Sequence, residues 1–178
     1  KILSIFTDRI ICCSRNLMNS ISKLEKIPPI KLFPLINTFN MNKLKITRAA
    51  SEIKKEIGLS ESDLVIGNIA SLTYRKGQDI LLKAFKIINE GLPSTKLIFI
   101  GGEVKEFKQK LLDLARSSGL SDKVFFLGRK DKIADYLNVM DIFVLSSRFE
   151  CIPLAVLEAM YMQLPIVATD VGGISEVI

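Results

Sequence analysis

The chain has 178 residues, 48% of them hydrophobic, which suits one folded domain with part of a second. Its apolar runs are far shorter than the roughly 20 residues that a membrane-spanning helix needs, and we identify no secretory signal. Cys12, Cys13 and Cys151 lack the spacing of a disulfide framework or zinc site, and histidine is absent. We therefore expect buried or incidental thiols, no metal and a reducing, cytoplasmic setting.

The net charge of +6 is concentrated in the first third of the chain. Residues 1–60 carry 11 Lys or Arg against 4 Asp or Glu, whereas residues 61–178 carry 14 against 15. Scattered lysines most often form a solvated surface, so membrane association is the second interpretation and nucleic-acid binding the third. Few aromatic residues, with no tryptophan, and the distance of the basic excess from the motifs below weaken the nucleic-acid interpretation further.

The first part of the chain lacks a core of its own. Ser14 is placed to cap a helix whose apolar positions recur through residues 16–24, before two prolines stop it. Residues 31–37 are extended or a strand, and the Asn-rich and Lys-rich residues 37–48 form a linker. A helix near residues 48–57 is expected to end at Gly58.

From residue 64 onward, short apolar segments and amphipathic segments alternate regularly. Near-continuous apolar strands separated by helices predict an α/β fold, with a parallel sheet covered by helices on both faces. The predicted strands are residues 64–70, 96–101, 123–127, 141–146 and 165–169, and the helices are residues 80–89, 103–118, 131–138 and 153–162.

Three loops follow strands of this predicted sheet, at residues 71–77, 146–152 and 170–175. Ligands of such sheets bind outside the carboxyl ends of the strands, which is where these loops meet. The first loop places Arg75 and Lys76 between a strand and a helix, where two fixed positive charges suit a diphosphate.

The second loop leads into a pair of carboxylates, Glu150 and Glu158, separated by seven residues. We expect Pro153 at the first helical position, so that the free N–H groups after it point toward an anion. One carboxylate then lies in a loop at the mouth of the helix and the other inside the helix. A phosphate-bearing ligand flanked by hydroxyl groups fits this arrangement.

Together these motifs resemble the C-terminal, donor-binding domain of the retaining glycosyltransferases of family 4, the group 1 glycosyltransferases. The resemblance implies a Rossmann-like domain of the GT-B fold. The matching pieces are, in order, residues 75–77 with 81–85, residues 96–102, 124–128 and 141–147, the Glu150-to-Glu158 segment, and residues 164–176.

The front of the chain is similar to the family more weakly. Residues 7–14 resemble the last strand and turn of the N-terminal domain, and residues 34–37 resemble the interdomain connector. The resemblance implies the end of an acceptor domain at 1–36, a linker and helix at 37–61, and a C-terminally truncated nucleotide-sugar-binding domain at 62–178. Since two domains of about 150 residues are expected, the chain is interpreted as a fragment that is inactive alone.

The resemblance also implies a role for each motif residue. Lys76 contacts the donor diphosphate and compensates the charge that grows on the leaving group. Glu150 binds the sugar hydroxyls or stabilises positive charge at the anomeric carbon, and Glu158 accepts hydrogen bonds from the ribose diol. The backbone at Lys130 meets the base. The expected catalytic residues are Glu150 and Lys76, and the remaining donor-binding set comprises Arg75, Lys130, Cys151, Ile152, Pro153, Leu154 and Glu158.

Two positions depart from the family's pattern. Ser71 stands where the family usually has an arginine five residues before the lysine, so either Arg75 substitutes or the phosphate site is weakened. Cys151 replaces a common glycine, and its side chain is expected to crowd the sugar. Glu176 is a weaker candidate that simply favours the positive end of its own helix.

The implied activity is retaining transfer of a hexose from a nucleoside-diphosphate sugar to a saccharide or lipid-linked acceptor, in cell-surface glycan or glycolipid synthesis. No metal or other cofactor is expected, and the partners are the rest of the same protein's N-terminal domain and, at the inner face of the membrane, peripheral lipid. The alternative is a non-catalytic nucleotide-sugar-binding or scaffold module, motivated by Ser71 and the truncation. An inverting enzyme of the same architecture, or a sugar epimerase, generally lacks the Glu150-to-Glu158 spacing.

Overall fold

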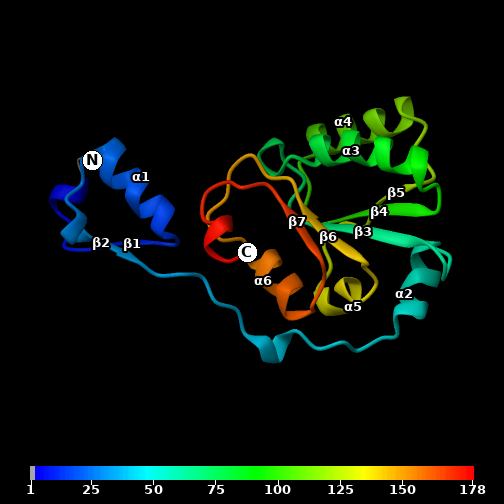
Figure 1. Ribbon diagram of the computed structural model, residues 1–178, viewed down its shortest axis with the longest axis horizontal. Helices are drawn as coiled ribbons and strands as arrows, with labels where there is room; N and C mark the ends of the chain where they lie inside the picture. The colour runs from blue at the N-terminus through cyan, green and yellow to red at the C-terminus, as the bar shows by residue number, and fades with distance from the viewer. Residues whose placement is uncertain (1–2) are drawn as a thin grey trace.

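The computed structural model describes residues 3–178, and its central feature is a five-stranded parallel sheet (Figure 1). The strands lie in the order β5-β4-β3-β6-β7, and every neighbouring pair is parallel. This arrangement confirms the predicted α/β fold. The strands are β3 (Leu64–Ile69), β4 (Thr95–Ile100), β5 (Val124–Phe126), β6 (Ile142–Leu145) and β7 (Ile166–Ala168).

Helices cover both faces of this sheet, as predicted. Figure 1 shows α3 (Gln78–Gly91) and α4 (Lys105–Ser117) on one face, with α2 (Ala50–Ile57), α5 (Ile133–Leu137) and α6 (Leu154–Tyr161) on the other. Successive residues of a strand point to opposite faces, so β4 contributes to two separate apolar clusters. Leu97 and Phe99 pack with α3 and α4, whereas Ile98 and Ile100 pack with residues of α2, α5 and α6.

The N-terminal segment forms a small unit of its own. Strands β1 (Ile10–Cys12) and β2 (Leu32–Pro34) pair in parallel, and α1 (Arg15–Glu25) connects them. The Ser14 hydroxyl accepts a hydrogen bond from the Leu17 N–H at 3.0 Å, which confirms the predicted cap. The expectation that this part of the chain lacks a core of its own is wrong, because Cys12, Ile27 and Leu32 form a small buried apolar cluster within it.

The sequence predicted that one helix ends at Gly58 and that another begins at Pro153. Helix α2 ends at Gly58, which adopts the left-handed conformation with φ of 80°, as expected for this C-cap. Pro153, however, is not the first residue of α6 as predicted. Its backbone is extended, with ψ of 130°, so Pro153 is the N-cap and the helix begins at Leu154.

The linker is fixed to the domain by one buried carboxylate. Asp135 in α5 is 1% exposed and accepts hydrogen bonds from the Thr47 N–H at 2.6 Å, the Thr47 hydroxyl at 2.8 Å and the Arg48 N–H at 3.2 Å. Burial raises the pKa of Asp135, but the hydrogen bonds from Thr47 and Arg48 outweigh burial and hold the pKa below its usual value. The end of the linker is therefore held against α5.

No helix within residues 3–178 combines the length and apolar character needed to cross a membrane.

Candidate functional site

The three predicted loops meet at the carboxyl ends of the parallel strands. The Ser146 hydroxyl donates to the Gly77 carbonyl oxygen at 2.8 Å, which joins the second loop to the first. The Thr169 hydroxyl donates to the Ser147 carbonyl oxygen at 2.6 Å, which joins the segment after β7 to the second loop. These bonds place the basic residues of the first loop beside the acidic residue of the second.

Lys76 and Glu150, the two expected catalytic residues, form an ion pair. The Lys76 Nζ lies 2.5 Å from the Glu150 Oε1, and the two side chains are 12% and 4% exposed. The Ser147 hydroxyl donates to the same carboxylate oxygen at 2.6 Å. A buried carboxylate needs both charge compensation and hydrogen-bond donors. Lys76 supplies the charge, and Lys76 and Ser147 both donate hydrogen bonds.

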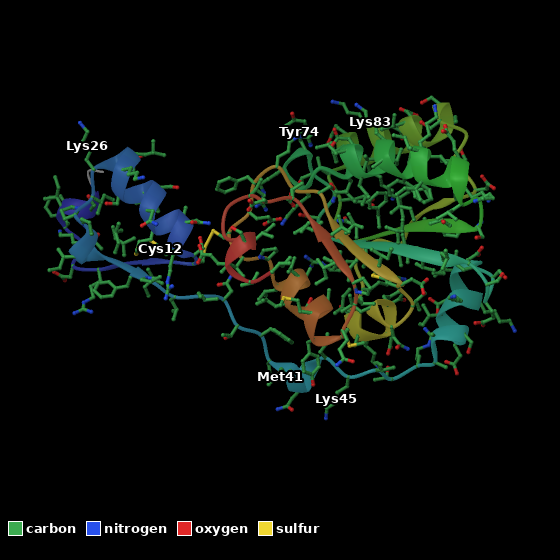
Figure 2. The ribbon with its side chains drawn as sticks, viewed as in Figure 1. Cys12, Lys26, Met41, Lys45, Tyr74 and Lys83 are labelled. Atoms are coloured by element: carbon green, nitrogen blue, oxygen red, sulfur yellow. A yellow bond between two sulfur atoms is a disulfide. The ribbon has the colours of Figure 1, made fainter. Side chains whose placement is uncertain are left out.

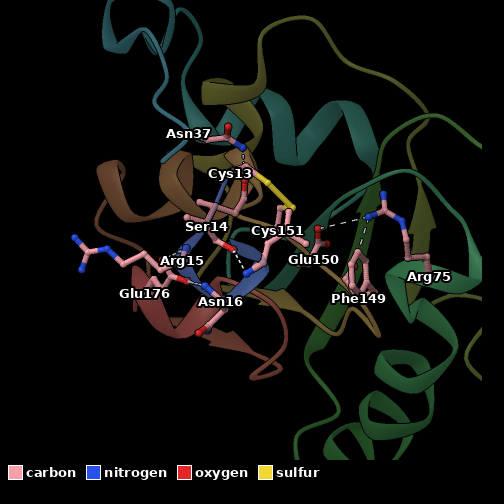
Figure 3. Close-up of a disulfide and its surroundings, with 12 residues drawn as sticks. Cys13, Ser14, Arg15, Asn16, Asn37, Arg75, Phe149, Glu150, Cys151 and Glu176 are labelled. Carbon is pink, nitrogen blue, oxygen red and sulfur yellow. Dashed lines mark hydrogen bonds and ion pairs between the residues drawn. A yellow bond between two sulfur atoms is a disulfide. The ribbon is translucent and has the colours of Figure 1, made fainter. Parts of the chain in front are cut away.

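Arg75 brings a second positive charge to the same carboxylate. Its Nη1 lies 3.8 Å from the Glu150 Oε2 and 3.5 Å from the Phe149 carbonyl oxygen (Figure 3). The Arg75 side chain is 52% exposed, so this contact is loose compared with that of Lys76. Two basic side chains therefore converge on one carboxylate.

Arg148 is a residue of this site that the sequence did not reveal. Its guanidinium donates to both carboxylate oxygens of Asp79 at 2.8 and 2.7 Å and to the Tyr74 carbonyl oxygen at 2.6 Å, and it lies 3.9 Å from the Tyr74 ring centre. Its backbone N–H donates to the Arg75 carbonyl oxygen at 2.8 Å. Arg148 thus holds the loop of Glu150 against the turn that carries Arg75 and Lys76.

Replacement of Arg148 by methionine is expected to lower the free energy of unfolding by about 1–3 kcal/mol at neutral pH, because hydrogen bonds to charged groups are lost. The Arg148 hydrogen bonds hold the pKa of Asp79 below its usual value, although burial opposes them. The stabilisation is therefore present above the pKa of Asp79 in the unfolded chain and disappears as the pH falls through the folded pKa.

Urea denaturation of the wild type and the Arg148→Met variant over a range of decreasing pH measures this difference. Arg116→Met is the matched control, because that side chain is 75% exposed and its ion pair with Asp113, at 3.5 Å, lies on the surface. A stability difference that stays constant down to strongly acidic pH would contradict the assigned role of Asp79.

Glu158 lies in a different environment from Glu150. It lines a pocket of about 410 Å³, and burial raises the pKa of its carboxyl group. One wall of this pocket comes from the linker, which the sequence did not predict. The remaining lining residues are Thr38, Phe39, Asn40, Leu44, Asp131, Ile133 and Leu154.

The other expected donor-binding residues lie around these two places. Lys130 precedes the pocket residue Asp131, and its Nζ lies 5.2 Å from the Tyr136 ring centre. Ile152 is 2% exposed and packs inward, and Pro153 is the N-cap of α6. The structure therefore brings Arg75, Lys76 and Glu150 together and places Glu158 and Leu154 in the lining of a separate pocket.

The expectation of incidental cysteine thiols is wrong for two of the three cysteines. Cys13 and Cys151 form a disulfide, with their Cα atoms 6.1 Å apart (Figure 3). Only Cys12 is free, and burial raises the pKa of its thiol. The turn after β1 lies against the loop of Glu150, a contact between residues 138 positions apart that spacing rules cannot detect.

Glu176 was expected to stabilise the positive end of its own helix, but its carboxylate binds the beginning of a different helix. Its carboxylate accepts hydrogen bonds from the Arg15 and Asn16 N–H groups at 2.9 and 2.7 Å, at the beginning of α1 (Figure 3). A carboxylate at this end favours the positive pole of the helix dipole. The Asn16 side chain in turn donates to the Gly172 carbonyl oxygen at 2.7 Å.

Among residues 3–178, the structure contains no group of three or more Cys, Asp or Glu side chains placed to hold a metal ion.

Comparison with protein families matches residues 50–178 to the model described as "Glycosyl transferases group 1". The chain is 32% identical over 173 residues to the N-acetyl-alpha-D-glucosaminyl L-malate synthase of Bacillus anthracis, covering 97% of this chain and 44% of that protein. It is 31% identical over 131 residues to the lipopolysaccharide core biosynthesis mannosyltransferase LpsB of Rhizobium meliloti, covering 72% and 37%.

Solved structures give the same fold. The complex of Anabaena Alr3699/HepE with UDP-glucose matches with a TM-score of 0.88 at 22% identity, covering 96% of this chain and 47% of that one. WaaG, described as a glycosyltransferase involved in lipopolysaccharide biosynthesis, matches with a TM-score of 0.83 at 19% identity, covering 94% and 46%. The chain thus spans less than half the length of these relatives.

Proposed function

Because this chain belongs to the group 1 glycosyl transferases, we propose that it carries the donor site of a retaining glycosyltransferase that uses a nucleoside-diphosphate sugar. The observation that carries the proposal is the cluster of Lys76, Arg75 and Glu150 where the loops meet. The proposal includes transfer of a hexose with retention and transfer to a separate acceptor. It also includes the expectation that activity requires the rest of the protein.

In this proposal Lys76 exchanges part of its contact with Glu150 for the donor diphosphate. A cation positioned before the reaction stabilises the charge that develops on the leaving nucleoside diphosphate without reorganising. Glu150, still held by the Ser147 hydroxyl, accepts hydrogen bonds from the sugar hydroxyls. The free N–H groups at the start of α6 and the guanidinium of Arg75 supply further donors to the phosphates.

Ser71 motivated the alternative of a non-catalytic binding or scaffold module. The position of Arg75, 3.8 Å from the carboxylate with which Lys76 pairs, supports the catalytic proposal instead, because a second positive charge is present there. We propose that Arg75 compensates for Ser71 at the phosphates.

The nucleoside is proposed to occupy the pocket of Glu158. A vicinal diol donates two hydrogen bonds, and a carboxylate provides the acceptors for both. The pocket volume of about 410 Å³ lies within the range common for small-molecule sites. The backbone near Lys130, beside Asp131, is proposed to meet the base.

The wider setting rests on relatives whose printed names include a glucosaminyl transfer and a mannosyl transfer. We propose a hexose donor, without choosing the base, and a saccharide or lipid-linked acceptor used in cell-surface glycan or glycolipid synthesis. Activity without a metal, a cytoplasmic location and peripheral contact with the membrane complete the proposal.

Replacement of Glu158 by glutamine is expected to weaken binding of UDP or GDP about 10- to 100-fold. The reason is the loss of hydrogen bonds to a charged acceptor, each worth about 1.5–3 kcal/mol. Isothermal titration calorimetry of the 178-residue chain with both nucleotides gives the measurement.

Glu90→Gln is the control for that titration, because Glu90 is exposed on α3 and does not line the pocket. The proposal fails if the folded wild type binds neither UDP nor GDP. The assignment of Glu158 alone fails if the wild type binds a nucleotide and the Glu158→Gln variant binds it equally well.

A further inference from the structure

The Cys13–Cys151 disulfide joins the N-terminal unit to the domain that contains the five-stranded sheet. These two parts of the chain are also connected covalently by the linker. Cys13 follows β1 and precedes the N-cap of α1, whereas Cys151 directly follows Glu150. Figure 1 shows the N-terminal unit standing apart from the sheet, with the start of α1 beside the loops after β7. The bond therefore crosses a junction between two bodies.

Apart from this bond and the packing of the buried Ser14 against Gly173, the junction is held by hydrogen bonds. Glu176 accepts two hydrogen bonds from the beginning of α1, and Asn16 donates to the Gly172 carbonyl oxygen. The Asn37 side chain donates to the Ile152 carbonyl oxygen at 2.9 Å. The buried cluster of the N-terminal unit comprises only its own residues and shares none with the two clusters of the sheet. The described junction thus lacks a common apolar core.

The covalent bond ends beside the charged centre of the donor site. Cys151 is the neighbour of Glu150, whose carboxylate pairs with Lys76. The Gly173 N–H donates to the Cys151 carbonyl oxygen at 2.9 Å, so the loop after β7 is held to the same residue. A restraint on Cys151 is therefore also a restraint on the backbone of Glu150.

The three cysteine side chains differ in their exposure to solvent. Cys13 and Cys151 are both partly exposed, as thiol–disulfide exchange requires, whereas Cys12 is 1% exposed. Burial raises the pKa of the Cys12 thiol, which lowers its content of the reactive thiolate. Cys12 is adjacent to Cys13 in sequence, but its burial protects it from thiol–disulfide exchange. Figure 2 shows Cys12 within the N-terminal unit.

We propose that Cys13 and Cys151 form a reversible thiol–disulfide site that locks the N-terminal unit to the donor-site loop. Its redox partners are low-molecular-weight disulfides and thiols. In the oxidising direction the thiolate of one cysteine attacks a small disulfide and releases one small thiolate, which leaves a mixed disulfide. The thiolate of the other cysteine then displaces the second small thiolate, so two electrons pass from the cysteine pair to the small disulfide. A small dithiol reverses both steps.

The reduced state keeps the hydrogen bonds across the junction and the packing of Ser14 against Gly173, without the covalent bond. The segment around Cys151 and the beginning of α1 then open more often, because no bond limits their separation. This inference goes beyond the proposed transfer activity, and its readout requires no nucleotide.

Thiol counting tests whether the pair forms. The full 178-residue chain is equilibrated with excess oxidised glutathione or with dithiothreitol, unfolded in denaturant, alkylated and weighed by mass spectrometry. We expect one alkylated thiol after oxidation and three after reduction. The Cys12→Ser variant should give no alkylated thiol after oxidation and two after reduction, because Cys13 and Cys151 are unchanged in it. Three alkylated thiols in the oxidised wild type would overturn the proposal.

Hydrogen exchange tests whether the pair acts as a lock. Reduction is expected to accelerate exchange of the Arg15 and Asn16 amides, which bond to Glu176, by about tenfold or more. The same acceleration is expected in Cys12→Ser, whereas Cys13→Ser and Cys151→Ser should exchange rapidly in both conditions. Both single variants are measured, so that the test still stands if one of them fails to fold. Equal exchange of the oxidised and reduced wild type would overturn the lock.

Discussion

Replacement of Lys76 by methionine is expected to lower the free energy of unfolding by about 3–5 kcal/mol, because it removes the nearer of the two cations that pair with a buried carboxylate. The Glu150 carboxylate is 4% exposed and, among the described residues, would retain the Ser147 hydroxyl and the looser contact with Arg75. Chemical denaturation measures the loss. Binding of UDP should weaken toward that of uridine, because the proposed phosphate site loses the cation of Lys76.

A double variant separates the two roles of Lys76. Lys76→Met with Glu150→Leu removes both charges, and replacing a buried ion pair by apolar residues is often neutral for stability. We expect the double variant to recover most of the stability and none of the preference for UDP over uridine. A Lys76→Met protein that keeps wild-type stability would show that the carboxylate is not buried as described.

The parallel sheet was predictable because each strand carries its pattern locally. Strands buried on both faces contain a run of consecutive apolar residues, such as residues 97–100 of β4, and the helices between them show the spacing of one buried face. Once the strands are parallel, their carboxyl ends share one edge. The meeting of Arg75, Lys76 and Glu150 at that edge followed from topology, without any knowledge of side-chain contacts.

The contacts that sequence reasoning missed join residues far apart in the chain. Arg148 and Asp79 are 69 positions apart, and Cys13 and Cys151 are 138 apart. No periodicity or spacing rule relates such positions. The caps at Ser14 and Gly58 were predictable because a cap depends on its immediate neighbours.

The linker illustrates the same limit. Its composition predicted a polar connection, yet Thr38, Phe39 and Asn40 form a wall of the Glu158 pocket. The Phe39 ring meets the Tyr161 ring edge-on, with their centres 5.8 Å apart. A connecting segment can therefore contribute to a binding pocket because tertiary contacts place it there.

Replacement of Gly172 by alanine is expected to cost about 3 kcal/mol or more of unfolding free energy. Gly172 has φ of 63°, and a Cβ atom there would collide with the Glu150 carbonyl oxygen. The left-handed conformation alone costs a non-glycine residue about 1–2 kcal/mol. The remainder comes from displacing backbone rather than a flexible side chain, and the carbonyl of Gly172 also accepts the hydrogen bond from Asn16.

Gly119→Ala is the matched control, because Gly119 has φ of 70° and nothing lies within 4 Å of the added Cβ. Its loss of stability measures the conformational cost alone, and the excess at Gly172 measures the close approach to Glu150. Equal losses in the two variants would contradict that approach. A larger loss at Gly172, together with weaker UDP binding, would show that the loop after β7 fixes the backbone of Glu150, because no other change has been made near Lys76.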